Sequence, residues 1–339
     1  MNYWRAMDKV GLHFDFASTN DPEQELLDEI HAAGCSYIKL PPRKNVFSYY
    51  RNLKKISKNY EVVHVHGNSA TSYIELFALR KVPKRIVHNH NSVTEHPVIN
   101  ALLKPLFLNS YTCAIACSRL AGDWLFGKNH FKVLKNAIDL ERFKLDLNIR
   151  RSCREKFGLA DDEIVIGNVG KIIKQKNHAF LIDVFFEYHK IQPKSKLLLI
   201  GAGNLETSIR NKILKLNLQD CVIMAGLRTD IPNMLNVMDA FLFPSLWEGL
   251  PLSVLEAQAS GLPVFMSDVV SHEVAVSSCC FVKSLNEPAE CWANFIDFKM
   301  SSVGNRDELM RQNFDLLTKA GFNISQEAES LRDLYFKES

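Results

Sequence analysis

Two glutamates beside a predicted turn are the residues whose type and spacing first indicate chemistry. Glu248 stands in a loop, and Glu256 stands eight residues later, about one turn inside a predicted helix. Gly249 and Pro251 predict the turn, and backbone N–H groups around Ser253 are free at the start of the helix. Such N–H groups hold anions or sugar hydroxyls, so both carboxylates can line one ligand crevice. A surface loop followed by a solvated helix glutamate would show the same spacing.

Two lysines after a buried strand indicate a second charged site. The predicted strand 164–169 is followed by Gly170, and Lys171 and Lys176 then stand five residues apart on a loop before a helix. Lysine binds phosphate as a point charge, so the loop is a candidate phosphate site. An ordinary basic surface loop is the alternative that this pattern leaves open.

Glycine turns follow the next two predicted strands. Gly201 and Gly203 come directly after one apolar run, and the segment Gly226-Leu227-Arg228 comes after the next. Glycine lets the backbone approach a ligand closely at the start of a helix. Turns of this kind also serve packing alone, so each is only a candidate binding segment.

Histidines gather at the ends of two predicted strands in the first half of the chain, as His64, His66, His88 and His90. Imidazoles are common metal ligands, but no carboxylate or thiol stands beside them at a typical ligand spacing. We expect His88 and His90 to face opposite sides of their strand. A metal site or a His-Asn-His nuclease site stays open as a minor alternative to core, capping or substrate-facing histidines.

Length and composition limit the class of protein. A chain of 339 residues is long enough for about two domains, each with a full core. The formal net charge of +3 is too small to make nucleic acid the main partner. The eight cysteines form no C-x-x-C pair and are predicted to be reduced thiols of a cytosolic protein. No apolar run is long enough for a membrane span, and the N-terminus has no signal-peptide pattern.

Short apolar runs alternate with helical stretches through the whole chain, which predicts an α/β fold with parallel sheets. We expect two Rossmann-like, doubly wound domains, residues 1–145 and 146–339, that face a cleft. The polar stretch 142–155 is the predicted hinge. The predicted strands are 12–16, 37–40, 62–66, 85–89, 113–116 and 132–134 in the first domain, and 164–169, 196–200, 221–225, 240–243, 263–266 and 280–282 in the second.

Together these segments resemble the retaining glycosyltransferases of family 4, which have the two-domain GT-B fold. In the second half, 165–177 is similar to the family's strand and basic loop, 198–205 to its glycine turn, and 243–261 to its block with paired glutamates. The segments 62–67, 85–91, 114–118 and 135–143 match family segments in the first half. The resemblance therefore covers nearly the whole chain.

The resemblance implies a role for each matching position. Lys171 and Lys176 would neutralise the donor diphosphate, Glu248 would hold hydroxyls of the donor sugar, and His90 would face that sugar from the first domain. Glu256 would accept hydrogen bonds from the ribose. The remaining donor-binding positions implied are Gly170, Gly201, Gly203, Leu227 and Arg228 at the base and phosphates, and Gly249, Leu250, Leu252, Ser253 and Val254 through their backbone N–H groups.

Two departures from the family pattern stand out. The family has arginine where Lys171 stands, and lysine keeps the charge without the bidentate fork. The family also begins with a strand and a glycine-rich loop, whereas Asn2-Tyr3-Trp4-Arg5 is similar to the helix that follows them. We therefore expect an N-terminal domain that lacks its first strand, or a true start upstream.

The resemblance predicts a cytoplasmic, retaining glycosyltransferase of surface-polysaccharide synthesis, such as capsule or exopolysaccharide. Its donor would be a nucleotide-diphosphate sugar, and its acceptor a saccharide or a lipid-linked saccharide. No metal or other cofactor is expected, because lysines and helix N–H groups supply the positive charge. The segment 102–108, with Lys81, Lys84 and Arg85, would contact the inner face of the plasma membrane, or is a packed helix with a solvated end.

Three rival functions fit the same residues. The chain could be an inactive nucleotide-sugar-binding relic, a GT-B-type nucleotide-sugar epimerase, or a nucleotide-regulated binding module. Acceptor-dependent turnover of a labelled donor separates the glycosyltransferase from all three.

Overall fold

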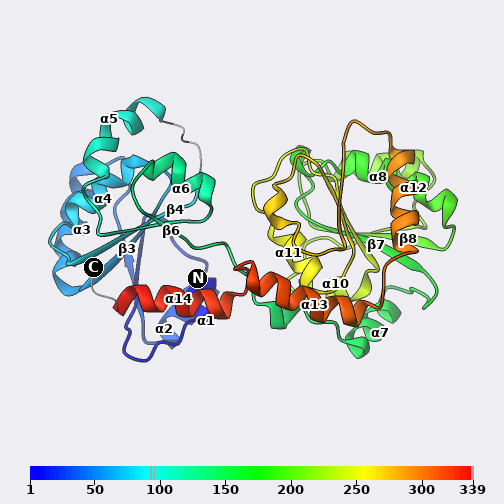
Figure 1. Ribbon diagram of the computed structural model, residues 1–339, viewed down its shortest axis with the longest axis horizontal. Coiled ribbons are helices and arrows are strands. Elements are labelled where there is room, and N and C mark those ends of the chain that lie inside the picture. The colour runs from blue at the N-terminus through cyan, green and yellow to red at the C-terminus, as the bar shows by residue number, and fades with distance from the viewer. Residues whose placement is uncertain (92–93, 95, 337–339) are drawn as a thin grey trace. The chain divides into compact units, whose positions relative to one another are not determined.

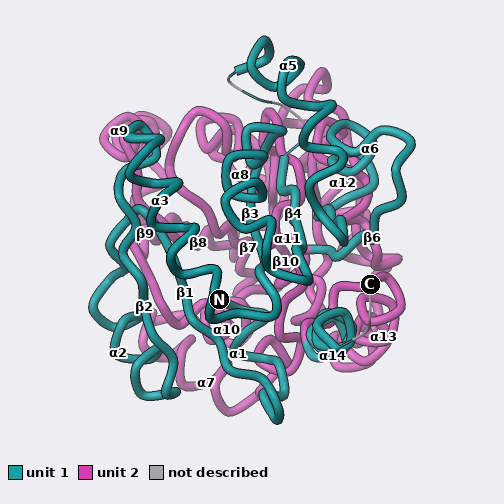
Figure 2. The backbone as a smooth tube through the Cα atoms, turned by 90° about the vertical axis from the view of Figure 1, so that its left-hand side faces the viewer, with its two compact units in different colours: residues 1–135, 325–339 teal, residues 136–324 magenta. Residues whose placement is uncertain are grey.

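The computed structural model describes residues 1–91, 94 and 96–336, which form two compact α/β units (Figures 1 and 2). Unit 1 contains Met1–Lys135 together with the segment from Ser325, and unit 2 contains Asn136–Ile324. The compact units meet at Lys135–Asn136, whereas the predicted boundary lies between 145 and 146, and the segment from Ser325 packs with unit 1. The physical reason is hydrogen bonding: the Ile138 N–H donates to the carbonyl of Phe322, which ties the start of unit 2 to its end.

The sheet of unit 2 is parallel and has six strands in the order β12-β11-β10-β7-β8-β9. All six predicted strands are present, with small shifts at their ends. They read as continuous apolar runs because helices cover both faces of the sheet. The strands are β7 (Ile164–Val169), β8 (Ser195–Ile200), β9 (Val222–Met224), β10 (Ala240–Phe243), β11 (Val264–Ser267) and β12 (Cys280–Lys283).

Two apolar cores lie on the opposite faces of this sheet. One is formed with α7 (Leu147–Lys156), α10 (Ile231–Val237), α11 (Leu252–Ala259) and α13 (Arg306–Lys319). The other is formed with α8 (His178–Ile191), α9 (Glu206–Lys215) and α12 (Ala289–Met300). Figure 1 shows α8 and α12 on one side of β7 and β8, and α11 on the other.

The charged stretch 142–155, predicted as a hinge, contributes most of helix α7 and belongs to unit 2. Two of its arginines pair with a single carboxylate: Arg150 lies 2.6 Å and Arg154 3.3 Å from Asp239. Only 2% of the Arg154 side chain is exposed. The local composition looks solvated, but the partner that buries these arginines comes from a distant part of the chain.

The main sheet of unit 1 is also parallel and has four strands in the order β3-β4-β5-β6. Two further strands pair only with each other, so the predicted sheet of unit 1 is divided into two pieces. The strands are β1 (Asp15–Ser18), β2 (Ser36–Lys39), β3 (Val62–Gly67), β4 (Lys84–Asn89), β5 (Cys113–Ala116) and β6 (Lys132–Val133). As expected from the first residues, a helix precedes β1.

The helices of unit 1 are α1 (Asn2–Ala6), α2 (Gln24–Ala32), α3 (Val46–Ile56), α4 (Tyr73–Ala78), α5 (Pro97–Phe107), α6 (Arg119–Phe126) and α14 (Ile324–Phe336). The last of these was not predicted. Ala328 and Leu331 of α14 are buried in one cluster with Met7, Ile86 and Ile115, so α14 completes the core beneath β4 and β5. In the part of the chain described, no helix combines the length and apolarity needed to cross a bilayer. All eight cysteines are free thiols.

Candidate functional site

The basic loop and the glutamate loop are in direct contact in unit 2. They follow β7 and β10, which are neighbouring strands, so their carboxyl ends lie at one edge of the sheet. The Leu246 N–H donates to the carbonyl of Gln175 over 2.8 Å, and Nε2 of Gln175 donates to the carbonyl of Trp247 over 2.9 Å. Two motifs that are far apart in sequence therefore form one surface, at the position where parallel α/β sheets bind ligands.

An ion pair joins the charged side chains of these two loops. Lys176 Nζ lies 2.6 Å from Oε1 of Glu248, and the side chains are only 16% and 11% exposed. Lys176 Nζ also lies 4.6 Å from the centre of the Phe243 ring, within cation–π range. The lysine chain passes over Gly170, where a Cβ would stand 3.3 Å from Lys176 Cε. Lys176 is thus a partly desolvated, positioned cation, whereas Lys171 is exposed.

The glycine turn after β8 packs against the basic loop. Gly201 has a φ of +135°, and a Cβ built there would overlap the carbonyl oxygen of Gly170. A Cβ at Gly203 would overlap the carbonyl of Ile172 in the same way. These glycines therefore have a packing role, since any side chain would push the basic loop out of place. Their contact with a ligand stays a prediction.

Glu256 lies on α11 and is held in a different environment from Glu248. Burial raises the pKa of Glu256 to about 6, and the charge of Arg142 opposes that shift. Among the described residues no ion pair is made with this carboxylate. A carboxylate that has lost water without gaining a cation favours hydrogen-bond donors such as hydroxyls. That property suits the predicted contact with ribose.

The start of α11 offers fewer donors than predicted. Pro251 occupies the N-cap position and makes no side-chain cap, so the N–H groups of Leu252 and Ser253 lack an intrahelical acceptor. The Val254 N–H, in contrast, donates to the carbonyl of Pro251 over 3.2 Å. Gly249 and Leu250 precede this turn, and Gly249 is exposed.

The predicted base-binding residues follow β9. Leu227 is exposed, as a surface for an aromatic base would be. The Arg228 guanidinium makes two hydrogen bonds to the carboxylate of Asp230, at 2.8 and 2.6 Å. Its charge is therefore already compensated, and it is available to a ligand mainly through its flat face.

His90 lies in unit 1, beside the three other histidines. The expectation that His88 and His90 face opposite sides is wrong: their ring centroids are 4.2 Å apart. Residues two apart on a strand point to the same face, so the two His-x-His strings each present both rings together. The register of β3 and β4 sets His66 opposite His88 and brings the strings side by side. The four histidines stood out in the sequence, but their common face was not predicted, although the repeated His-x-His spacing was the available signal.

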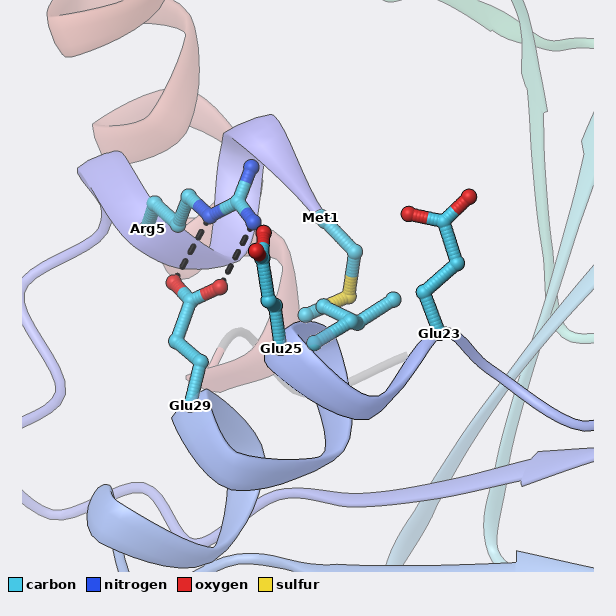
Figure 3. A pocket seen from close by; sticks show the side chains of 6 residues that line it. Met1, Arg5, Glu23, Glu25 and Glu29 are labelled. Atoms are coloured by element: carbon cyan, nitrogen blue, oxygen red, sulfur yellow. Dashed lines mark hydrogen bonds and ion pairs between the residues drawn. The ribbon is translucent and has the colours of Figure 1, made fainter.

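A pocket of about 320 Å³ lies elsewhere in unit 1, between α1 and α2 (Figure 3). The guanidinium of Arg5 points at Glu29 and makes hydrogen bonds of 2.7 and 2.6 Å to its carboxylate. The pocket contains none of the predicted site residues, and the one basic side chain of its lining, Arg5, is neutralised by Glu29. Its lining consists of Met1, Arg5, Glu23, Glu25, Leu26 and Glu29.

The two halves of the chain match two family models. Residues 2–142 match Glycosyltransferase Family 4, and residues 149–278 match Glycosyl transferases group 1. Together these regions contain the histidine strings, the basic loop and both glutamates.

Relatives and solved structures agree with the models. The chain is 30% identical to the putative glycosyltransferase EpsF of Bacillus subtilis, covering 99% of this chain and 91% of that protein. It is 29% identical to the Escherichia coli UDP-Gal:alpha-D-GlcNAc-diphosphoundecaprenol alpha-1,3-galactosyltransferase, covering 86% and 79%. The fold is similar to that of Anabaena Alr3699/HepE in complex with UDP-glucose, with a TM-score of 0.71, 16% identity, and coverage of 95% and 91%. The chain belongs to the family 4, group 1 glycosyltransferases, with the GT-B fold.

Proposed function

We propose that this glycosyltransferase transfers a sugar from a nucleotide-diphosphate sugar to a saccharide or lipid-linked saccharide, with retention of anomeric configuration. The observation that carries the proposal is the Lys176–Glu248 ion pair at the edge of the unit 2 sheet. It sets a cation beside a carboxylate that can accept hydrogen bonds from hydroxyl groups. A sugar diphosphate needs both, the cation for its phosphates and the acceptor for its sugar hydroxyls. The named substrates of the galactosyltransferase relative and the UDP-glucose bound to Alr3699/HepE support the same donor and acceptor classes.

In the proposed reaction the bond between the anomeric carbon and the diphosphate oxygen breaks. The acceptor hydroxyl oxygen forms a new bond on the same face of the sugar, and its proton passes to the departing phosphate. Negative charge grows on the diphosphate during this step, and Lys176 and Lys171 stabilise it. No protein nucleophile is required, so the glutamate pair does not act as the acid and base of a hydrolase.

The glutamates divide the donor between them in this proposal. Glu248 accepts hydrogen bonds from sugar hydroxyls while it orients Lys176 toward the phosphates. Glu256 accepts hydrogen bonds from the ribose, and the N–H groups of Leu252 and Ser253 hold phosphate oxygens. The lysines and helix N–H groups supply the positive charge, so the proposed step uses no metal ion.

We propose that α5 is the contact of this cytoplasmic enzyme with the inner face of the plasma membrane. Val98, Leu102 and Leu106 stand four residues apart on α5 and are 70%, 72% and 53% exposed. An exposed apolar stripe on a helix suits insertion at a lipid interface. Figures 1 and 2 show α5 projecting from unit 1.

The basic residues predicted to assist α5 are mostly committed elsewhere. Lys84 is buried, and the guanidinium of Arg85 donates to the carbonyls of Val82 and Ser110. The proposed membrane contact therefore depends on the apolar stripe rather than on a basic patch.

Turnover with labelled nucleotide sugars and a membrane-lipid extract tests the enzymatic proposal. We expect release of nucleoside diphosphate only when an acceptor is present, and a product whose anomeric NMR coupling matches that of the donor. An epimerised free nucleotide sugar formed without acceptor would identify an epimerase instead. Donor binding without consumption, across the donor and acceptor panels, would identify a relic or a binding module.

A further inference from the structure

One face of the unit 1 sheet carries a ladder of imidazoles, and the proposed reaction gives no role to His64, His66 or His88. His64 and His66 lie on β3, His88 lies on β4, and His90 follows it directly. The ring centroids are 4.4 Å apart for His64–His66, 5.3 Å for His66–His88 and 5.4 Å for His64–His88. Matched register and a two-residue pleat thus bring rings from both strands onto one face.

We infer that His64, His66 and His88 form a binding site for a divalent transition-metal ion, with Zn²⁺ as the best-suited ion. One ring nitrogen from each residue can be chosen so that all three lie within 4.8 Å of one another. A Zn–N distance of about 2.0–2.1 Å corresponds to nitrogens roughly 3.4 Å apart, so the rings must rotate toward one another to bind the ion. Three imidazoles are a known ligand set for zinc and leave a fourth position for water or another ligand.

The hydrogen bonds of the ladder leave at least one nitrogen of each ligand ring free for the metal. His64 Nδ1 lies 2.8 Å from the Tyr335 hydroxyl, and its buried Nε2 has no partner. His66 Nδ1 lies 2.9 Å from Nε2 of His90, which leaves Nε2 of His66. His88 is 4% exposed, and neither of its ring nitrogens has a partner. His66 is exposed, whereas the buried, unpaired nitrogens of His64 and His88 point to a ligand that takes their lone pairs.

Tyr335 and His90, the hydrogen-bond partners of His64 and His66, match the usual surroundings of a metal site. A histidine ligand ordinarily donates its second N–H to an outer acceptor, which fixes the tautomer and the ring orientation. Tyr335 on α14 can accept from His64, and His90 can accept from His66. Metal binding also requires neutral imidazoles. Burial lowers the pKa of His64 and of His88 well below the ordinary value, so both rings are neutral near pH 7.

The inference does not rest on the proposed function. In that proposal the negative charge that grows on the diphosphate is stabilised by lysines of unit 2, and no metal ion takes part. It also specifies the chemistry of the ion. Imidazole ligands favour Zn²⁺, Co²⁺, Ni²⁺ and Cu²⁺, whereas Mg²⁺ prefers oxygen donors. Mg²⁺ is accordingly a matched negative probe for this site.

Metal titration of the full chain, produced without a polyhistidine tag and stripped with chelator, tests the site. We expect one equivalent of Co²⁺ to give the visible absorption of a low-symmetry imidazole complex, and Zn²⁺, but not Mg²⁺, to displace it. Tyr335→Phe is expected to weaken Zn²⁺ by about 10–100-fold, the usual effect of losing an outer partner. His88→Asn, which removes a ligand, is expected to weaken it further. His130→Asn, at an exposed histidine of the same unit, is the matched control and should leave the affinity unchanged.

Circular dichroism and melting of the metal-free variants separate lost binding from lost folding. Zn²⁺ should raise the melting temperature of the wild type and of His130→Asn, but not of His88→Asn. If His88→Asn does not fold, His64→Gln serves as the second ligand variant. The inference is overturned if the folded wild type binds no Co²⁺, or if a folded ligand variant binds Zn²⁺ as tightly as the wild type does.

Discussion

Lys176 Nζ lies 2.6 Å from Oε1 of Glu248, although the two residues come from loops that follow different strands of the unit 2 sheet. Each side chain orients the other while both are largely shielded from water. A donor diphosphate would compete with Glu248 for the same ammonium. In the proposed reaction the pair would therefore link recognition of the sugar to stabilisation of the leaving group.

Removing the cation is the first test of this arrangement. Lys176→Ala is expected to slow donor turnover by about 10²–10³, or about 2.7–4 kcal/mol, because it removes charge aimed at the leaving group. Lys174→Ala is the matched control, since Lys174 is exposed on the same loop and should be close to neutral. Steady-state kinetics with a saturating acceptor gives the comparison, and equal losses in the two variants would contradict the assignment.

Substitution of the two glutamates is expected to weaken the binding of different ligands. Glu256→Gln should weaken both the nucleotide sugar and the free nucleoside diphosphate, with each lost charge-assisted hydrogen bond worth about 1.5–3 kcal/mol. Glu248→Gln should weaken only the sugar donor, because the free diphosphate has no sugar hydroxyl and gains access to Lys176. Isothermal titration calorimetry with both ligands distinguishes these patterns. The reverse pattern would exchange the two roles.

Donor affinity is expected to depend on pH through Glu256. Its folded-state pKa is about 6, so the carboxylate loses its charge as pH falls below about 6, and ribose binding weakens. The phosphates of a nucleotide sugar stay ionised there and do not contribute to the change. In the free protein the sign is opposite: a folded pKa above the ordinary 4.5 means that stability increases as pH falls through about 6.

Titrations of the nucleotide sugar across this pH range, with melting curves of the free protein, measure both trends. Glu256→Gln should remove both of them together. A wild-type donor affinity that is flat across this range would contradict the proposed contact between Glu256 and the ribose.

Chelation is expected to leave turnover intact. Lysines and helix N–H groups hold the diphosphate in the proposed reaction, so EDTA should not abolish activity at temperatures where the protein stays folded. Activity measured before and after chelator treatment, with the fold followed by circular dichroism, gives the answer. A complete loss of activity that added metal ion reverses would mean that the lysines are not sufficient to stabilise the diphosphate.

The buried arginine of α7 is expected to matter for stability rather than for the reaction. Arg154→Ala removes a guanidinium that is hydrogen-bonded to Asp239 and to the carbonyls of Val237, Ala160 and Glu163. The free energy of unfolding should fall by about 3–5 kcal/mol, as when one partner of a buried pair is removed. Urea denaturation measures the change. Arg151→Ala, at the exposed neighbouring position, should stay within about 0.5 kcal/mol of wild type.

The local sequence pattern was sufficient to predict some elements of this molecule and not others. The strands of unit 2 were predictable because each is an apolar run bounded by turn residues, and the two charged loops follow from that order. Helix α7 was missed because Arg150 and Arg154 look solvated in the local sequence, whereas Asp239, far away in sequence, pairs with both of them. Helix α14 was missed as part of unit 1 because its buried residues, Ala328 and Leu331, find partners at the opposite end of the chain. The same-face histidines were predictable from their spacing alone.

The return of α14 to unit 1 has a consequence for the order of events during synthesis. Unit 2 is continuous in sequence, so a ribosome releases all of its residues before it releases Ala328 and Leu331. Unit 1, although it begins first, lacks the part of the core that α14 packs against Ile86 and Ile115 until the second unit is complete. The half-made chain is therefore most exposed to aggregation and to chaperone capture through its earlier portion, contrary to the usual expectation that the first domain folds first.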